Sequence, residues 1–266
     1  MLWETLASSE IGLLADPKQN TGGAVHLYGQ YCPVARAAEL LADRWTVLII
    51  RELLADITHF NDLERGLPGI SRTLLAERLR RLVHAGVVER RTASRGLRID
   101  YRVTVAGREL QQLIDLLGTW GARWAFGDPQ QNELDPGVLM WWMRRRVCLN
   151  RMPRPRIVIE FEFRGVPSKK HFWFVIESSA GASICLQNPG FDVDVIVAAD
   201  IAAFYRVWLG HMPFAEAVRR GDLHLDGMPA DIRSFQSWFA WSPMEATVRE
   251  ALLNARRPEL DKLPPK

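Results

Sequence analysis

The break at Pro68-Gly69, between two stretches of helical hydrophobic spacing, restricts the fold of this chain more than any other feature of its sequence. Before the break, Phe60, Leu63 and Leu67 recur at helical intervals. After it, Ser71 stands where a helix N-cap belongs, and the apolar residues that follow share one helical face. These residues are Leu75, Leu79, Leu82 and Val83. Proline and glycine end one helix and force a tight turn, so the pattern predicts a helix-turn-helix.

A hairpin is predicted directly after the second helix. Gly86 ends the helical pattern as a left-handed C-terminal cap would. Residues 87–93 and 97–104 then alternate between apolar and polar side chains around a loop that contains a glycine. A hairpin in this position is the wing of a winged helix-turn-helix domain.

Three further helices are predicted around this motif. Residues 33–43 and 44–56 have helical patterns, and the second is apolar enough to be a core helix. Thr104 can cap a long helix over residues 105–126. Along that helix, Leu113, Leu117, Trp120 and Trp124 form an apolar seam. A lone winged helix cannot cover such a seam, so we expect a two-fold homodimer that buries it.

Arginine is concentrated on the second helix of the motif and on the hairpin. Between Arg72 and Arg108 there are ten arginines against three acidic residues, although the net charge of the whole chain is only +3. Arginine bonds phosphates and guanine edges in a planar, bidentate way that lysine does not reproduce. We therefore expect both elements to contact duplex DNA. The expected contact residues are Ser71, Arg72, Thr73 and Arg80 on the helix, and Arg95 and Arg98 on the wing.

A second cluster has six arginines between Arg144 and Arg156 and no acidic residue. Charge runs of this kind usually belong to a solvated surface. A linker and a strand edge are predicted there, with contact to the phosphate backbone of DNA as the alternative.

The character of the chain changes after residue 126. Residues 127–137 are rich in Gly, Pro, Asn and Asp, which predicts a linker over 127–139. Strands are predicted over 156–165, 169–177, 182–188, 193–199 and 222–227, and helices over 200–210, 213–221 and 231–241. The second half is therefore predicted to be an α+β domain built on an antiparallel sheet.

Aromatic side chains mark both layers of this second domain. Large rings that face one another leave either a tight core or a gap for an apolar ligand. A ligand pocket between sheet and helices is predicted, with Tyr205 or His224 as a polar group at its rim. Its expected lining is Phe161, Phe163, Phe174, Phe204, Trp208, Phe235 and Trp238.

Length and composition favour two globular domains, since the chain has 266 residues, of which 48% are hydrophobic and 24% charged. The predicted segments are a flexible leader over 1–26, a DNA-binding and dimerisation domain over 27–126, the linker, a ligand-binding domain over 140–245 and a tail over 246–266. The N-terminus lacks the pattern of a secretory signal, and no apolar run reaches the ~18 residues of a membrane span. Three distant cysteines do not predict disulfides. A cytoplasmic protein is expected.

No arrangement of residues predicts catalysis. The six histidines are scattered without metal-ligand spacing, and the sequence has no Cys/His cluster. Nucleophile elbow, Walker loop and dinucleotide fingerprint are all absent from it. We expect neither an enzyme nor a bound metal or cofactor.

Residues 29–126 resemble the HxlR-type winged-helix transcriptional regulators of bacteria. The resemblance is carried by YCPVARAAELLADRWTVLIIREL, HFNDLERGLPGISRTLLAERLRRLVHAGVVERR and IDYRVTVAGREL. One departure is His59, where the family more often has an arginine before the phenylalanine. The resemblance implies a homodimer on a pseudo-palindromic operator. It also implies that Cys32 could sense oxidants, as the cysteine at this place does in some members; an inert structural cysteine is the alternative.

Residues 140–240 resemble sterol-carrier-protein-type lipid-binding domains, which bury an apolar ligand between a sheet and helices. The resemblance is carried by DVDVIVAADIAAFYRVWLGHMPFAEAVRRGDLHLDG: a strand, a helix, a glycine before a short helix, then a strand. The chain is therefore predicted to be a bacterial transcriptional regulator that responds to an apolar small molecule. The alternatives are a redox regulator that acts through Cys32, and a lipid carrier or enzyme with an attached winged helix.

Overall fold

The structure is a computed structural model that describes residues 28–92, 99–167 and 170–260, with the main chain alone over 255–260. It consists of two compact units, residues 1–115 (unit 1) and residues 116–266 (unit 2). Each unit has its own hydrophobic core. Among the described residues, no helix has the length and apolar character that a membrane span requires.

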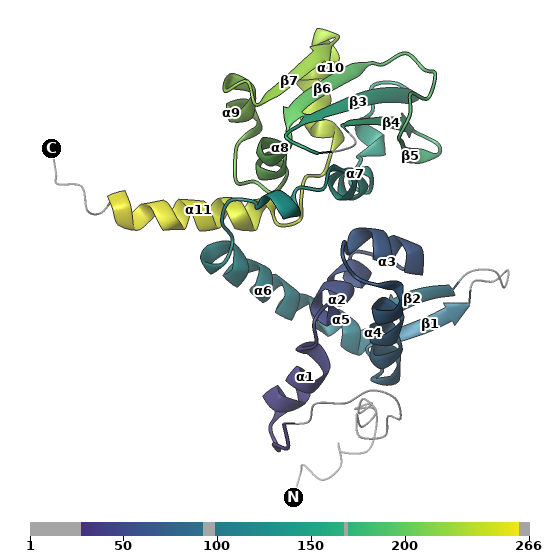
Figure 1. The fold of residues 1–266 in the computed structure, drawn as a ribbon, viewed down its shortest axis with the longest axis vertical. Helices are drawn as coiled ribbons and strands as arrows, with labels where there is room; N and C mark the ends of the chain where they lie inside the picture. Colours follow the sequence, from purple (N-terminus) through teal and green to yellow (C-terminus); the bar gives the residue numbers. More distant parts are fainter. Residues whose placement is uncertain (1–27, 93–98, 168–169, 261–266) are drawn as a thin grey trace, which may run out of the picture. The chain divides into compact units, whose positions relative to one another are not determined.

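Unit 1 contains the predicted winged helix-turn-helix (Figure 1). Its elements, in chain order, are α1 (Pro33–Leu41), α2 (Thr46–Leu54), α3 (Phe60–Gly66), α4 (Arg72–His84), β1 (Val88–Thr92), β2 (Ile99–Val103) and α5 (Val105–Glu109). β1 and β2 pair antiparallel, with Val88 opposite Val103 and Thr92 opposite Ile99. The tip of the wing, residues 93–98, lies outside the described residues.

Local signals set both ends of α4, as expected. The Ser71 hydroxyl accepts a hydrogen bond from the Leu74 N–H at 3.2 Å, which is the bond of an N-cap. Leu75, Leu79 and Leu82 are fully buried and anchor the helix in the core of unit 1. Gly86 has φ +72°, a left-handed conformation that ends the helix at low conformational cost.

The single helix predicted over residues 105–126 is wrong in one respect, because it is broken near Leu110. There α5 ends, and α6 (Gln111–Trp124) begins. Thr104 caps α5 as expected, since its hydroxyl accepts from the Gly107 N–H at 3.2 Å. Gly107 packs so tightly on the wing that a Cβ there would lie 2.3 Å from the Val87 carbonyl oxygen. This contact holds α5 against the residue that precedes β1 and against Val103 of β2.

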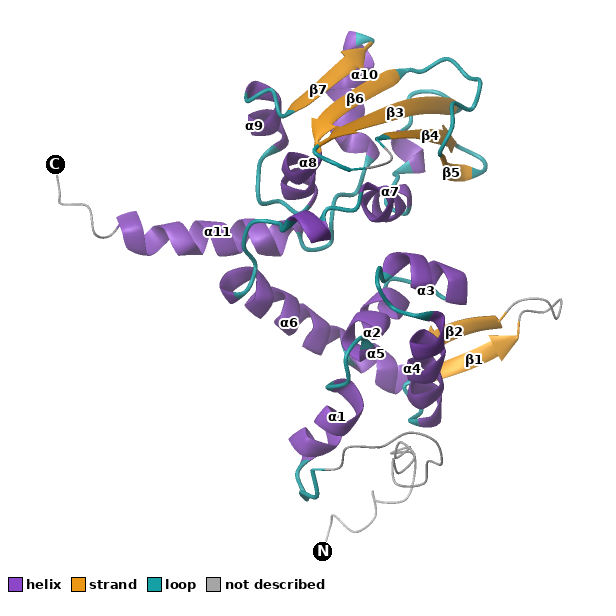
Figure 2. Ribbon diagram, viewed as in Figure 1, coloured by secondary structure: helices purple, strands orange, loops and turns teal. Residues whose placement is uncertain are grey.

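Unit 2 is built on a five-stranded sheet (Figure 2). The strands are β3 (Arg156–Arg164), β4 (His171–Glu177), β5 (Gly181–Cys185), β6 (Val195–Asp200) and β7 (Leu223–Gly227), in the spatial order β5-β4-β3-β6-β7. The prediction of an antiparallel sheet is wrong for one pair, since β3 and β6 run parallel. Residues 186–194 carry the chain from the β5 edge to the other side of β3. Alternation of side chains is the same in both kinds of pairing, so the pattern cannot reveal this crossover.

The helices of unit 2 differ from the prediction at several points. They are η2 (Gln131–Glu133), α7 (Pro136–Arg144), η3 (Leu149–Arg151), α8 (Ile201–Trp208), α9 (Phe214–Arg219), α10 (Pro229–Ser234), η4 (Phe235–Trp238) and α11 (Glu245–Leu260). The helix predicted over 231–241 is thus a short α-helix followed by a 3-10 turn. α7 begins inside the segment predicted as a linker, because its residues Leu139, Met140 and Met143 are fully buried in the core.

The predicted tail over residues 246–266 contains most of α11. Val248 is only 4% exposed, so the start of this helix belongs to the packed unit. Gly210, with φ +81°, approaches it so closely that a Cβ would lie 2.5 Å from the Glu245 carbonyl oxygen. This close contact with the turn after α8 holds the first turn of α11 in place.

Candidate nucleic-acid interface

The expected DNA-contacting residues of α4 lie together on its exposed side. Ser71, Arg72 and Thr73 begin the helix, and Arg80 follows two turns later; all four are exposed. The leucines of the opposite side are fully buried. Arg95 and Arg98 of the wing lie outside the described residues.

Two arginines of α4 stabilise the domain and do not face solvent. Arg78 and Arg81 have side chains only 14% and 18% exposed, and both face the carboxylate of Asp43, which precedes α2. Arg78 also pairs with Glu77 at 2.8 Å. Positive charge on this helix is therefore divided between internal ion pairs and the exposed side.

Arg90 is a candidate contact residue that the sequence interpretation missed. Together with Arg80 it borders an open hollow of about 460 Å³ between α4 and the wing, whose other lining residues are Ala76, Val83, His84 and Tyr101. Among the described residues, neither Arg80 nor Arg90 forms an ion pair. Strand alternation could have identified Arg90, because it lies two residues after the buried Val88 and so on the face of the hairpin that α4 covers.

Arg72 is held by side chains of α3. It pairs with the carboxylate of Glu64, donates to the Asn61 side-chain oxygen at 3.2 Å and lies 4.9 Å above the Phe60 ring. Its own side chain remains 61% exposed. A second open hollow, of about 500 Å³, lies beside it and is lined by His59, Phe60, Asn61, Asp62, Arg65, Arg72 and Ile99.

His59, the departure from the family pattern, contacts the wing. Its Nδ1 lies 2.7 Å from Oδ1 of Asp100 on β2. The backbone reinforces this contact, since the Tyr101 N–H donates to the Thr58 carbonyl at 2.8 Å. The residue therefore ties the start of α3 to the wing.

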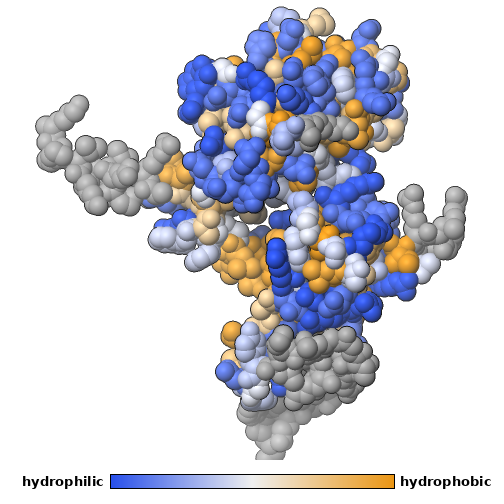
Figure 3. Space-filling model, in the orientation of Figure 1, coloured by the Kyte–Doolittle hydropathy of each residue, from blue (hydrophilic) through white to orange (hydrophobic). Residues whose placement is uncertain are grey.

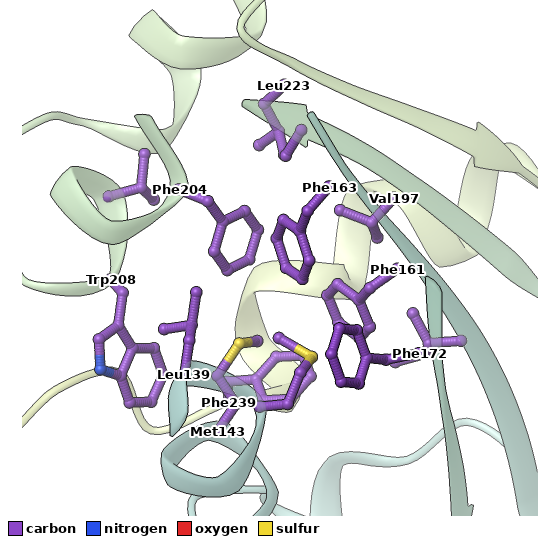
Figure 4. Packing of buried hydrophobic residues seen from close by; sticks show 14 of the residues in the cluster. Leu139, Met143, Phe161, Phe163, Phe172, Val197, Phe204, Trp208, Leu223 and Phe239 are labelled. Carbon is purple, nitrogen blue, oxygen red and sulfur yellow. The ribbon is translucent and has the colours of Figure 1, made fainter. Parts of the chain in front are cut away.

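The seven rings expected to line a ligand pocket are packed against one another in the core of unit 2. None of them is more than 2% exposed. The centroid of the Phe161 ring lies 5.2 Å from that of Phe174, and Phe204 lies 5.7 Å from Phe163 in an edge-to-face arrangement. Figure 4 shows several of these rings facing one another between sheet and helices. Ligand binding among them stays a prediction, and it would require rings to be displaced.

The two polar groups expected at the rim of that pocket are not placed there. The Tyr205 hydroxyl donates to the Asp135 carbonyl at 2.7 Å. Burial raises the pKa of this phenol above its ordinary value, and the negative charge of the nearby Asp135 carboxylate raises it further. His224 is exposed on β7. Because Leu223 points into the core, alternation puts His224 on the opposite face of the sheet.

The cluster between Arg144 and Arg156 is tied to the fold of unit 2. Three of its arginines donate hydrogen bonds to backbone carbonyls. Arg144 donates to Ala182 at 2.8 Å, Arg146 to Trp241 at 2.6 Å, and Arg151 to Ser237 at 3.3 Å. Arg154 pairs with Asp231, Arg156 pairs with Glu177, and Arg145 lies 5.9 Å from the Trp141 ring. Arg144 and Arg151 thus belong to α7 and η3 and not to a solvated linker, whereas Arg156 stands at the start of β3.

Cys32 is the N-cap residue of α1 and is partly buried, with a free thiol. Arg36, one helical turn after Cys32, pairs with the carboxylate of Glu39 at 3.2 Å. Within the described part of the chain, no group of three or more His, Cys, Asp or Glu side chains could hold a metal ion.

Comparison with known proteins identifies the family of unit 1. Residues 40–128 match the family of HxlR-like helix-turn-helix proteins. Over 97 residues the chain is 33% identical to YvaP, an HTH-type transcriptional regulator of Bacillus subtilis, in a match that covers 36% of this chain and 90% of YvaP. The chain belongs to the HxlR-like helix-turn-helix family. The HxlR-like match ends at residue 128, before α7 and the sheet of unit 2.

Other relatives match a similar share of the chain. An HTH-type transcriptional regulator of Mycobacterium tuberculosis is 45% identical over 89 residues, which are 33% of this chain and 56% of that protein, so the match spans little more than half of the relative's length. YodB of B. subtilis is 33% identical over 91 residues, which are 34% of this chain and 81% of YodB. The structure of reduced YodB covers 36% of this chain and 96% of its own, at 31% identity and a TM-score of 0.32.

Proposed function

We propose that this HxlR-like protein is a transcriptional regulator that binds a pseudo-palindromic operator as a homodimer. The observation that carries the proposal is the two-sided character of α4. Leu75, Leu79 and Leu82 are buried in unit 1, whereas the expected contact residues Ser71, Arg72, Thr73 and Arg80 are exposed together. In helix-turn-helix proteins the second helix lies in the major groove, and its first residues contact base edges.

Two arginines that form no ion pair with any described residue support a path for the phosphate backbone. Arg80 and Arg90 border the hollow between α4 and the wing. When a recognition helix occupies the major groove and a wing contacts the neighbouring backbone, a phosphate strand passes between the two elements. Two guanidinium groups without an ion pair in the described part of the chain would neutralise phosphates there and would release counterions from the DNA.

Selection of bound duplexes from a random library, with the full chain, tests this proposal. We expect enrichment of a two-fold symmetric sequence, with half-sites separated by about one DNA turn. Arg80→Ala and Arg90→Ala should each weaken binding to all duplexes and reduce the slope of log affinity against log salt by about one. Arg220→Ala removes the same charge from unit 2 and should leave both quantities unchanged. Failure of the wild type to enrich any sequence would refute the proposal.

The apolar seam of α6 supports the homodimer. The four side chains of the seam are exposed to solvent: Leu113 by 38%, Leu117 by 45%, Trp120 by 61% and Trp124 by 69%. Among the described residues, no residue of α6 is buried. Figure 3 shows hydrophobic side chains gathered over this helix. Exposed apolar patches with large aromatic residues mark protein–protein contacts, and a second copy of the same helix is the partner that a two-fold axis provides.

Unit 2 is proposed to be a domain of the sterol-carrier type that responds to an apolar small molecule. The order of its elements supports this assignment, because β6, α8, Gly210, α9 and β7 follow one another as the resemblance implies. Since the rings between sheet and helices are in contact, we propose that a ligand would bind only after the core opens. A lipid carrier or enzyme remains the alternative for this unit.

A redox response through Cys32 is the second candidate function. The thiol lies at the N-terminus of α1 and is only partly buried. Structures of the relative YodB are described as its reduced form and as quinone-bound. Treatment with a thiol oxidant or a quinone should change operator affinity in the wild type and should have no effect in Cys32→Ser. An equal change in both proteins would exclude Cys32 as the sensor.

A further inference from the structure

Three side chains of α3 converge on the first residue of the recognition helix. Glu64 pairs with the Arg72 guanidinium, Asn61 accepts from it at 3.2 Å, and the Phe60 ring lies 4.9 Å below it. They occupy positions 60, 61 and 64, which lie on one side of the short helix α3. Arg72 therefore has a defined orientation while more than half of its side chain is open to solvent.

A fixed orientation changes what an arginine can discriminate. A freely rotating side chain can reach phosphates or any acceptor on a base edge, so it adds affinity without sequence preference. An arginine whose guanidinium is held on one side presents only its remaining N–H groups, in a set direction. Bidentate recognition of guanine requires such a geometry.

Glu64 also carries a negative charge at this surface, with a side chain 30% exposed. Like charges about 4 Å apart in water repel by an energy that corresponds to roughly a five-fold change in affinity. A carboxylate beside the recognition helix therefore weakens binding to every duplex. Where Arg72 forms hydrogen bonds with a suitable base edge, these bonds offset the repulsion. At other sequences the repulsion is not offset. Repulsion of wrong partners is a recognised source of specificity.

We propose that Glu64 is a specificity-determining positioning residue, which holds Arg72 for one base and lowers affinity for all other sequences. The inference rests on the proposed DNA-binding function. The proposed function can hold while this inference fails. If Glu64 only neutralised the charge of Arg72, the protein would select the same operator sequence with or without this carboxylate.

The test uses the full chain, the enriched operator and operators with one base pair changed. Glu64→Ala should bind unrelated duplex roughly three- to ten-fold tighter than the wild type. It should also lose about five-fold or more of the discrimination at one base position in each half-site. Glu64→Gln removes the charge but keeps an acceptor for Arg72, so it should bind unrelated duplex more tightly and retain most of the discrimination.

Asp62→Ala is the matched control, because it also removes a carboxylate from α3. The Asp62 carboxylate pairs with Arg65, at 3.3 Å, and not with Arg72. It should tighten binding generally and leave discrimination intact. Asn61→Ala, which changes no charge, should lower discrimination at the same base position without tightening general binding. In an Arg72→Ala background, Glu64→Ala should have no further effect on discrimination.

Unchanged discrimination in Glu64→Ala would overturn the inference, as would an equal loss in Asp62→Ala or in the Arg72→Ala background. Melting curves of each variant show whether it is folded; if Glu64→Ala is not, Asn61→Ala and Glu64→Gln decide the question. A wild type that enriches no sequence would overturn the proposed function itself, and this inference with it.

Discussion

The guanidinium of Arg81 is paired with the carboxylate of Asp43, which precedes it by 38 residues in the chain. This ion pair joins α4 to the turn before α2, and Arg81 is only 18% exposed. The neighbouring Arg80 points to solvent and has no ion pair among the described residues. We therefore propose that two adjacent arginines of one helix have different roles, Arg81 in stability and Arg80 in DNA binding.

Substitution of these two arginines should separate the roles. Arg81→Ala should lower the free energy of unfolding of unit 1 by about 1–3 kcal/mol, because the partly buried Asp43 loses its main charged partner. Arg80→Ala should change that free energy by less than about 0.5 kcal/mol, since it is a surface substitution. Urea unfolding followed by circular dichroism measures both values. Equal destabilisation by the two substitutions would contradict the assignment.

Tyr205 should make the stability of unit 2 sensitive to alkaline pH. Burial raises the pKa of its phenol in the folded state, so the unfolded chain releases this proton first as pH rises. The contribution of Tyr205 is therefore fully present below its ordinary pKa of about 10 and declines above it, by up to about 1.4 kcal/mol per pH unit. Urea unfolding at pH 8 and at pH 11 measures the decline.

Tyr205→Phe should weaken this pH dependence. At pH 8 it should also cost about 1–2 kcal/mol, because the Asp135 carbonyl loses the hydrogen bond from the hydroxyl. Tyr31→Phe is the control, since that side chain is fully exposed, and it should change neither quantity. The same alkaline decline in wild type and Tyr205→Phe would show that other groups are responsible.

The seam of α6 predicts the oligomeric state. Trp120→Asp should yield monomers, because a buried charge at a two-fold contact is repeated on both copies. Light scattering at micromolar concentration measures the mass, and DNA binding should weaken in the same variant. Asp115→Asn, on the same helix, serves as a control for charge change and should stay dimeric. A monomeric wild type would refute the proposed assembly.

A ligand for unit 2 should raise its melting temperature by linkage. A long-chain fatty acid is a suitable probe, and operator affinity in its presence should change if the two sites are coupled. Trp208→Ala should destabilise unit 2 by about 3–5 kcal/mol and leave a cavity, since the ring is 2% exposed. A melting shift that occurs only in Trp208→Ala would show that the natural core stays closed and that the domain is structural or protein-binding.

The local organisation of unit 1 follows from the sequence alone. Hydrophobic spacing predicted α4 and its buried leucines, Ser71 and Thr104 were predicted as N-caps, and Gly86 as the end of the helix. Each of these features depends on residues within one or two turns of the chain. Interactions over such short separations are encoded directly in spacing and residue type.

Tertiary structure decided the partners of residues that are far apart in the chain. Composition showed ten arginines in the motif, but only the fold brings Asp43 to Arg81 and leaves Arg80 and Arg90 without ion pairs to any residue that the structure describes. The same holds in unit 2, where β6 runs parallel to β3 and Tyr205 reaches a carbonyl 70 residues away. The alternation of a strand and the period of a helix indicate which face of the element is buried, but they do not indicate which other element covers that face. A ring meant for a pocket and a ring meant for a solid core therefore have the same sequence pattern, and only packing distinguishes them.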